Sequence, residues 1–380
     1  MSKDRTGPLA GLRVVEIAGA GSLALAGMML ADLGAEVIRV EHGAAREPMP
    51  RPARFDIALR GRETVTLDLR AEAGRAALLE MLAGADALIE GEGPGGLEAL
   101  GLGPEACLAR NPRLVYGRLS GWGQSGPLAG APGLDINHVS LVGALHACGR
   151  QNEAPTLPFG MIADYAGPSY FLATGVLAAL IETLGSGQGQ VVDAARVDAV
   201  ALLMTTYISL YQAGMLTLDR GTNLLDTGSP FYDCYECADG RYVAFGGIER
   251  KFYHQLLEEL GLDDPALRDQ APGNWARVRA ALSATFKTRS RDDWAARLGT
   301  TDTCFAPVLD LTEAFAHPQV RARGTYVEVE GVMQPGPNPK FSRTPLTAPM
   351  PAGSASAAEA LAGWLPEGEI AALVQSGVLA

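Results

Sequence analysis

The residues best suited to chemistry lie in one stretch, from position 116 to position 164. A short apolar run there breaks into a loop with five glycines and two prolines over residues 121–133. Further on, the apolar run 161–167 carries a single carboxylate, Asp164. Loops that follow strands in α/β proteins commonly bind substrates, and a carboxylate presented from an apolar run can act as a base, an acid or a nucleophile. We therefore expect the chemistry to lie between these two loops.

The elements that must position this stretch are those of an α/β protein. Apolar runs predict strands over residues 12–17, 37–40, 87–90, 114–119 and 190–193, and a half-buried strand over 64–68. Helices are expected between them, with the longest over 168–184 and 195–214. This succession predicts a largely parallel sheet with helices on its faces. Gly19, Gly21 and Ala24 match the dinucleotide-binding pattern after the first strand, although a tight strand-to-helix turn selects the same small residues for packing.

The chain is long enough for two domains. We expect a large domain over residues 1–200, completed by 318–380, then a linker helix over 201–225 and a small domain over 226–317. A hairpin is predicted over 231–245, with its turn at 238–240. Helical patterns follow at 251–261, 275–286 and 291–298, and residues 331–351 are expected to run extended.

Composition narrows the class of protein. With 47% hydrophobic and 19% charged residues the chain is globular. A net charge of −12 argues against nucleic acid or an anionic membrane as the main partner. The five cysteines are scattered and odd in number, which predicts free thiols and a cytoplasmic location. No metal site is predicted, because the histidines lack ligand spacing.

Five segments together carry a family resemblance. They read GLRVVE at 11–16, ADLGAEVIR at 31–39, GWGQSGP at 121–127, GQVVDA at 189–194, and FYDCYECADG at 231–240 leading to GGIERKFY at 246–253. In this order they resemble the α-methylacyl-CoA racemases of the family III CoA-transferase superfamily, over nearly the whole chain.

The resemblance implies a Rossmann-like large domain that binds CoA, a smaller α+β domain, and an interlocked homodimer with its active site at the interface. It implies a 1,1-proton transfer, in which a base removes the α-proton of a 2-methylacyl-CoA and an acid returns it on the other face. Coenzyme A would be part of the substrate, and no other cofactor is expected.

The resemblance implies that Asp164 and Glu249 are catalytic residues, because they stand at the positions of the family's catalytic acids in two matching motifs. The histidine that the racemases place in the motif at 133–138 is Leu134 here, and His138 stands where they have tyrosine. If this segment is helical, positions 134 and 138 share a face, so His138 is a third catalytic candidate. The alternative is that His138 only packs there. Asp135 is expected to cap or anchor its loop, and for Asp164 the structural alternative is a helix N-cap.

Candidates for contact with substrate or CoA come from the same comparison of motifs. Arg39 and Arg62 match basic positions of the family and suit phosphate groups, with surface ion pairs as the alternative. The remaining candidates are Ile17, Leu134, Tyr165 and Gly121.

Three functions follow from these assignments. The first is a racemase- or epimerase-like isomerase, which differs from the racemases because Leu134 replaces their histidine. Such an enzyme could also work with one base only. The second is a family III CoA-transferase in which Asp164 is the nucleophile. The third is a repurposed active site on a specialised substrate without CoA.

Overall fold

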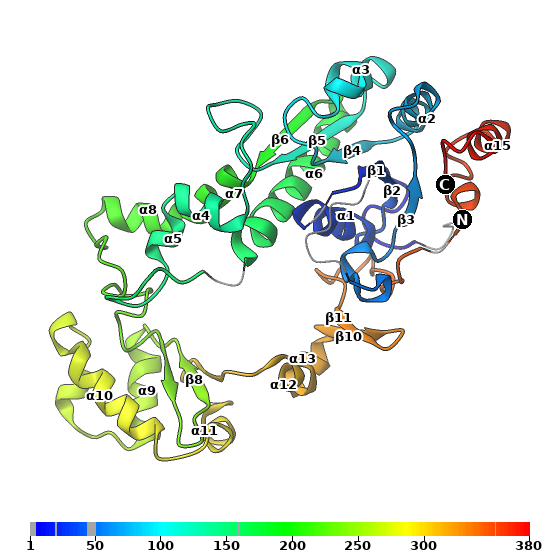
Figure 1. Cartoon of the computed structure of the whole chain (residues 1–380). Helices are drawn as coiled ribbons and strands as arrows, with labels where there is room; N and C mark the ends of the chain where they lie inside the picture. Colours follow the sequence, from blue (N-terminus) through cyan, green and yellow to red (C-terminus); the bar gives the residue numbers. More distant parts are fainter. Residues whose placement is uncertain (1–4, 20, 44–50, 158–159, 354) are drawn as a thin grey trace. The chain divides into compact units, whose positions relative to one another are not determined.

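The computed structural model describes residues 5–19, 21–43, 51–157, 160–353 and 355–380 (Figure 1). The chain divides into two compact units. The first comprises Met1–Val142, Phe159–Leu203 and Gln319–Ala380, and the second Gly143–Pro158 and Met204–Pro318. Each unit has a hydrophobic core of its own.

The first unit is built on a six-stranded sheet. Its strands are β1 (Arg13–Ile17), β2 (Glu36–Glu41), β3 (Glu63–Thr66), β4 (Ala87–Glu90), β5 (Val115–Ser120) and β6 (Val191–Ala195). They lie in the order β3-β2-β1-β4-β5-β6, and every neighbouring pair is parallel. The predicted parallel α/β sheet is therefore confirmed. Because the strands are parallel, the loops after β1, β2, β4, β5 and β6 all leave from one edge.

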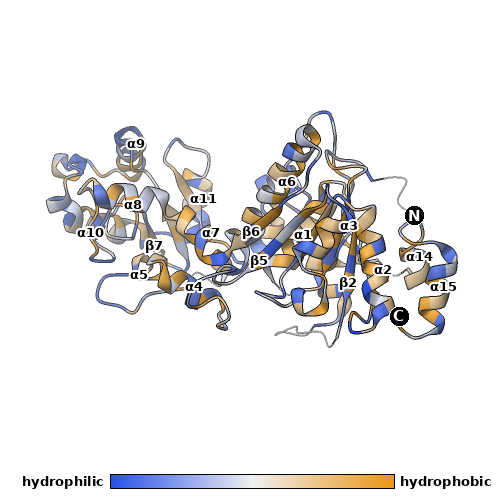
Figure 2. Ribbon diagram, turned by 90° about the horizontal axis from the view of Figure 1, so that it is seen from above, coloured by the Kyte–Doolittle hydropathy of each residue, from blue (hydrophilic) through white to orange (hydrophobic). Residues whose placement is uncertain are grey.

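Helices cover both faces of this sheet. Alternate strand residues point to opposite sides, so Val14 joins the core beneath α1 (Ser22–Asp32) and α6 (Pro168–Ser186). Val15 joins the opposite core, beneath α2 (Glu72–Ala83) and α3 (Pro104–Arg110). Two terminal helices, α14 (Ala357–Ala360) and α15 (Glu367–Gln375), pack into this second core beside α2 (Figure 2).

Helix α6, with the turn before it, is long and apolar enough to cross a membrane by length and composition alone. One of its faces is occupied, because Leu172, Val176 and Ala179 pack in the core against the sheet. Packing in the core accounts for the apolar residues on that face, whereas Tyr170, Ile181 and Leu184 on the helix are exposed.

The second unit joins helices to a three-stranded antiparallel sheet. Its strands are β7 (Asp233–Glu236), β8 (Tyr242–Phe245) and β9 (Phe305–Pro307), in that order. The hairpin predicted over 231–245 is thus confirmed. The helices are α5 (Ala144–Ala147), α8 (Thr205–Gln212), α9 (Arg250–Leu260), α10 (Trp275–Phe286), α11 (Arg291–Leu298) and α12 (Leu311–Ala316). The core of this unit lies between the sheet and helices α9, α10 and α11, and Phe231, Tyr253, Phe286 and Trp294 are large buried members of it.

The expected linker helix over 201–225 is wrong. The helix expected from 195 is interrupted at Met204, which separates α7 (Arg196–Leu203) from α8. The chain then turns at Gly214, which has a φ of 69°, a left-handed conformation that ends helices. Residues 217–229 form a loop instead, in which the side chain of Asp226 accepts hydrogen bonds from the backbone N–H groups of Gly221, Asn223 and Gly228.

Two further segments differ from expectation. Residues 143–158 belong to the second unit, because Arg150 forms an ion pair with the buried Asp233 at 2.8 Å. The segment expected to run extended from 331 begins as strand β11 (Val332–Pro335), which pairs antiparallel with β10 (Tyr326–Val329). Helix α13 (Pro318–Arg323) precedes this hairpin.

A buried cluster of charges links the first strands of the sheet. Glu16 lies opposite Arg39 in the register of β1 and β2, and its carboxylate pairs with the guanidinium groups of Arg39 and Arg62. The side chains of Glu16 and Arg62 have no exposed surface. Burial raises the pKa of Glu16, while both arginines oppose that shift. Gly27 of α1 makes room for the cluster, because a Cβ there would overlap Glu16 Oε2 and Arg62 Nη1.

Gly27→Ala tests this arrangement. The added methyl group must displace a buried ion pair, so we expect the free energy of unfolding to fall by about 3 kcal/mol, measured by urea denaturation. Gly185→Ala is the matched control, since a Cβ at this position in α6 meets nothing within 4 Å. That variant should be neutral or up to about 1 kcal/mol more stable. Equal stability of the two variants would contradict the packing described.

Candidate active site

Asp164 lies in a single π-helical turn, Ile162–Ala166, immediately before α6. The turn is closed by the N–H of Gly167, which donates to the carbonyl of Ile162 at 2.8 Å. Gly167 is also the N-cap of α6, and the side chain of Asp164 does not cap that helix. The N-cap alternative for Asp164 is therefore wrong. Turns of this kind occur often at functional sites, and this one leaves the carboxylate partly exposed.

Asp135 anchors the turn. It is the first residue of α4 (Asp135–Leu141) and is buried. Its Oδ1 accepts hydrogen bonds from the backbone N–H groups of Ala163, at 2.6 Å, and Asp164, at 3.0 Å. The expectation that Asp135 caps or anchors its own loop is wrong, because its hydrogen bonds go to the segment of Asp164. Its second oxygen, Oδ2, is buried without a hydrogen-bond partner among the described residues.

Arg196 supplies the positive charge of the site. It is the first residue of α7, directly after β6, and its Nε lies 3.8 Å from Asp164 Oδ1. Its Nε and Nη2 both donate to the hydroxyl of Ser22, at 3.3 Å. Sequence reasoning missed Arg196 and Ser22. The available signal was position, since both follow strands that end at the edge where α/β proteins bind ligands.

The protonation of Asp164 reflects these neighbours. Burial of the carboxyl group raises the pKa of Asp164 above its ordinary value, Arg196 opposes this shift, and Asp135 adds to it. The net rise makes Asp164 a stronger base than a carboxylate in water. A pKa shifted by burial and a specific charged partner is typical of functional groups.

His138 is buried in packing contacts. Its side chain has no exposed surface, and its ring lies 4.5 Å from that of Trp122, centroid to centroid. A Cβ added at Gly121 or Gly133 would lie only 2.5 or 2.9 Å from His138 Nε2. Neither ring nitrogen has a hydrogen-bond partner in the part of the chain that the structure describes. Burial lowers the pKa of His138 to about 4, and Arg196 acts in the same direction.

The condition under which positions 134 and 138 would share a helix face is not met, because the helix begins after Leu134. Leu134 is the N-cap of α4, with an extended backbone at φ −118° and ψ 178°, and so lies outside the helix. Its side chain is 67% exposed, whereas His138 is buried. The geometry favours the packing role for His138, and its catalytic role stays a prediction.

The predicted binding residues divide into two groups. Ile17 is fully buried in the core of the sheet, and Arg62 is fully buried against Glu16. Neither side chain is accessible to a ligand in this conformation, so the expectation of a surface ion pair for Arg62 is wrong. Arg39 is also buried, held between Glu16 and Glu41.

The other candidates lie nearer the surface. Tyr165 and Leu134 are exposed, and Gly121 contacts the ring of His138. Glu249 belongs to the second unit, where it is the exposed N-cap residue of α9. Its catalytic role stays a prediction.

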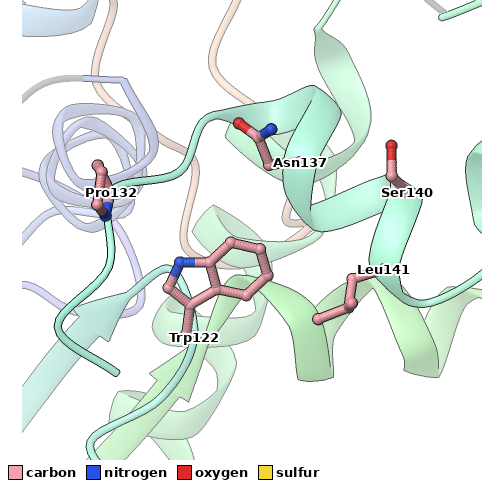
Figure 3. A pocket seen from close by; sticks show the side chains of 5 residues that line it. All are labelled: Trp122, Pro132, Asn137, Ser140 and Leu141. Carbon is pink, nitrogen blue, oxygen red and sulfur yellow. The ribbon is translucent and has the colours of Figure 1, made fainter. Parts of the chain in front are cut away.

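Two hollows in the described surface are large enough for small molecules. The first, of about 360 Å³, lies beside α4. In Figure 3 Leu141 extends from that helix toward the indole of Trp122, with Asn137 and Ser140 also at its border. Asp164 does not line it. The second, of about 630 Å³, lies in the second unit beside Arg150, Trp275 and Arg279.

Within the described ranges, no group of three or more His, Cys, Asp or Glu residues could hold a metal ion.

A parallel α/β sheet, with one activated carboxylate and one arginine at its carboxyl edge, defines an α/β protein with an acid–base or nucleophilic site. The model of the CoA-transferase family III matches residues 9–354. The chain belongs to this family and is an enzyme of it, so the resemblance inferred from its motifs is confirmed.

Three relatives illustrate the match. The α-methylacyl-CoA racemase of Mus musculus is 38% identical over 89% of this chain and 87% of its own. The succinate–glutarate CoA-transferase of Agrobacterium fabrum is 30% identical over 90% and 92%. The crystal structure of a CAIB/BAIF family protein from Brucella suis superposes with a TM-score of 0.77 at 26% identity, covering 98% of this chain and all of that one.

His138→Phe tests the packing role. Because the folded pKa of His138 is about 4 and its ordinary value is 6.5, the unfolded chain binds more protons between these values. The free energy of unfolding of the wild type should therefore fall as the pH falls through 6.5, and that of His138→Phe should not show this fall. Between pH 7.5 and pH 5, the free energy of unfolding of the variant should rise by about 2 kcal/mol relative to that of the wild type, measured by urea unfolding at both pH values. A constant difference would show that His138 titrates normally.

Proposed function

We propose that the protein is an α-methylacyl-CoA racemase-like isomerase, which moves a proton at the α-carbon of a 2-methylacyl thioester with Asp164 as the base. The observation that carries the proposal is the environment of Asp164. It is a carboxylate with a raised pKa, anchored in a π turn and only partly exposed. The similarity to the mouse racemase supports the substrate class.

The proton step follows from this geometry. The C–H bond at the α-carbon breaks, the proton binds to an Asp164 oxygen, and the electron pair moves to the thioester oxygen. A thioester α-proton is only weakly acidic, so the resulting enolate must be stabilised in a site that excludes water. The N-terminal end of α6 lies directly after the turn, and its dipole favours negative charge there.

Return of the proton decides the stereochemistry. Racemisation requires a second group on the opposite face of the enolate, and Leu134, where the racemases have histidine, cannot transfer a proton. We propose Glu249 for this step, with His138 as the less favoured candidate because it is buried. Without such a group, Asp164 would return the proton to the face from which it came.

We also propose the finer features that the family implies. The strand order β3-β2-β1-β4-β5-β6 supports a Rossmann-like large domain that binds CoA. The apolar side chains of Leu202 and Leu203 in α7, and of Ile208 and Tyr211 in α8, are exposed and support a homodimer. We propose a cytoplasmic location and no cofactor beyond the CoA of the substrate.

CoA transfer is the second candidate. Here the Asp164 carboxylate would attack the acyl carbon, the C–S bond would break, and the CoA thiolate would leave. The thiolate would then attack the aspartyl carbonyl carbon of the mixed anhydride. The C–O bond there would break and release the donor acid as its carboxylate, leaving an aspartyl-CoA thioester for an acceptor carboxylate to attack. The accessible Asp164 and the absence of histidine at position 134 favour it, and the Agrobacterium relative carries a transferase name. A third candidate, a repurposed site, would bind no CoA.

Incubation of each epimer of a 2-methylacyl-CoA in D2O tests the isomerase. We expect α-deuterium in the product by mass spectrometry, and epimerisation by chiral chromatography if Glu249 acts on the opposite face. Asp164→Asn should lower the exchange rate at least about 10²-fold. Asp263→Asn, at an exposed carboxylate of the second unit, is the control that should exchange at the wild-type rate.

The outcomes separate the candidates. Exchange with retention in the wild type, unchanged in Glu249→Gln, would mean a one-base enzyme. No exchange in the wild type would exclude the isomerase. In that case, a covalent CoA adduct on Asp164 would identify a transferase, and absence of CoA binding by calorimetry would indicate a repurposed site.

Sedimentation velocity tests the homodimer. We expect a single species of twice the chain mass at micromolar concentration. Leu202→Asp and Ile208→Asp place charges on exposed apolar positions, so they should shift the distribution toward monomer. Leu184→Asp, at an exposed position of α6, is the comparison variant. A monomeric wild type would contradict the proposal.

A further inference from the structure

We propose that Arg196 is a further catalytic residue, the counter-ion that pairs with the Asp164 carboxylate before proton transfer and with the thioester oxygen after it. The inference rests on the proposed function, because it needs an enolate to form at this site.

The guanidinium of Arg196 has unused bonding capacity. An arginine side chain carries five N–H donors, yet within the described residues only Nε and Nη2 of Arg196 donate hydrogen bonds, both to the single oxygen of Ser22 at 3.3 Å. Its contact with Asp164 is 3.8 Å, an ion pair too long for a hydrogen bond. The side chain is only 20% exposed, so water satisfies it incompletely. A mostly buried guanidinium group with so few hydrogen bonds is stabilised when a further anion binds to it.

Arg196 is also fixed in place. It begins α7 directly after β6, and the N–H of the next residue, Val197, donates to the carbonyl of Gly121 after β5. Ser22, at the start of α1, is fully buried, and its carbonyl accepts the hydroxyl of Ser169 at 2.8 Å. The guanidinium is thus held between two strand ends and the turn of Asp164. Positioned charge of this kind needs little reorganisation during a reaction.

The position of Arg196 suits the oxygen that becomes charged. The thioester carbonyl carbon is bonded to the α-carbon that Asp164 must approach, so the carbonyl oxygen comes close to any group beside Asp164. When the α-proton moves to Asp164, the carboxylate becomes neutral and the charge appears on that oxygen. Arg196 would then exchange one anion for another, and no buried cation is left unpaired at any stage.

The charged and titratable neighbours of Asp164 make this role measurable. They are Arg196 from α7 and Asp135 from α4. Arg196 itself also faces the hydroxyl of Ser22 from α1 and acts on the charge of His138 from α4. Arg196 lowers the pKa of Asp164 and Asp135 raises it. Burial lowers the pKa of Arg196 itself, although both carboxylates oppose that shift.

The test is the pH dependence of α-deuterium exchange in Arg196→Met, Arg196→Lys and wild type. For Arg196→Met we expect kcat to fall about 10²-fold with KM changed little, and the acidic limb of kcat/KM to move to higher pH. Arg196→Lys keeps the charge, so it should recover part of kcat and keep the acidic limb near that of wild type. Asp135→Asn removes the negative charge that raises the pKa of Asp164, so it should move the acidic limb of kcat/KM to lower pH.

Arg110→Met is the matched control, because Arg110 pairs with Glu80 at the exposed surface of the same unit. It should leave both kcat and the limb unchanged. Circular dichroism and thermal unfolding establish that each variant is folded, and Arg196→Lys keeps the proposal testable if Arg196→Met does not fold.

Each outcome has one meaning. A wild type that exchanges no deuterium overturns the proposed isomerase together with the role of Arg196. A wild type that exchanges, beside an Arg196→Met variant with unchanged kcat and acidic limb, overturns the role of Arg196 alone. If Arg196→Met loses activity only on a thioester whose acyl chain ends in a carboxylate, Arg196 binds that carboxylate, and the enolate role is also overturned.

Discussion

The candidate site depends on one carboxylate oxygen. A π-helical turn lengthens the usual hydrogen-bond spacing, and it leaves backbone N–H groups at its start that need other acceptors. Asp135 Oδ1 satisfies two of them, at Ala163 and Asp164, from a helix 28 residues earlier in the sequence. This contact joins α4 to the start of α6 and fixes the backbone from which the Asp164 side chain extends. Without it, buried N–H groups would be left unpaired, and the turn would relax toward an ordinary helix.

The same contact places two carboxyl groups close together in a partly buried region. Burial favours the neutral form of Asp164, and Asp135 adds to this effect, whereas Arg196 favours the ionised form. These influences oppose one another, so small changes in the surroundings of Asp164, such as the arrival of a substrate, can shift its protonation. This is the condition that a group alternating between base and acid requires. A carboxylate held firmly by a hydrogen-bonded arginine would be a weaker base.

The sequence predicted the parts of the fold that periodicity and turn residues determine. The parallel sheet, the hairpin at β7 and β8, and the placement of Asp164 before a long helix were all expected. The misassigned residues share a physical cause. Arg62 is fully buried because Glu16 and the missing Cβ of Gly27 create space for its guanidinium, and no local pattern reports such a contact. Arg196 was overlooked because its role depends on two contacts that only the assembled unit creates. Its side chain, which follows β6, lies against Ser22 at the start of α1 and beside Asp164 in the turn before α6.

The surroundings of positions 134 and 138 show how a small shift in a helix boundary changes a chemical argument. A helix beginning before Leu134 would place both side chains on one face, and His138 could then stand in for the absent histidine. The structure begins the helix at Asp135, where the side chain of Asn137 accepts the N–H of Leu134 at 3.0 Å. Leu134 is thus exposed and His138 is enclosed by Trp122 and two glycine backbones. A neutral imidazole with no partner in the described residues contributes mainly shape, so any second proton donor must come from elsewhere. The stereochemical outcome, rather than proton exchange itself, is therefore the measurement that separates the proposed two-base isomerase, with Glu249 as the second group, from a one-base enzyme.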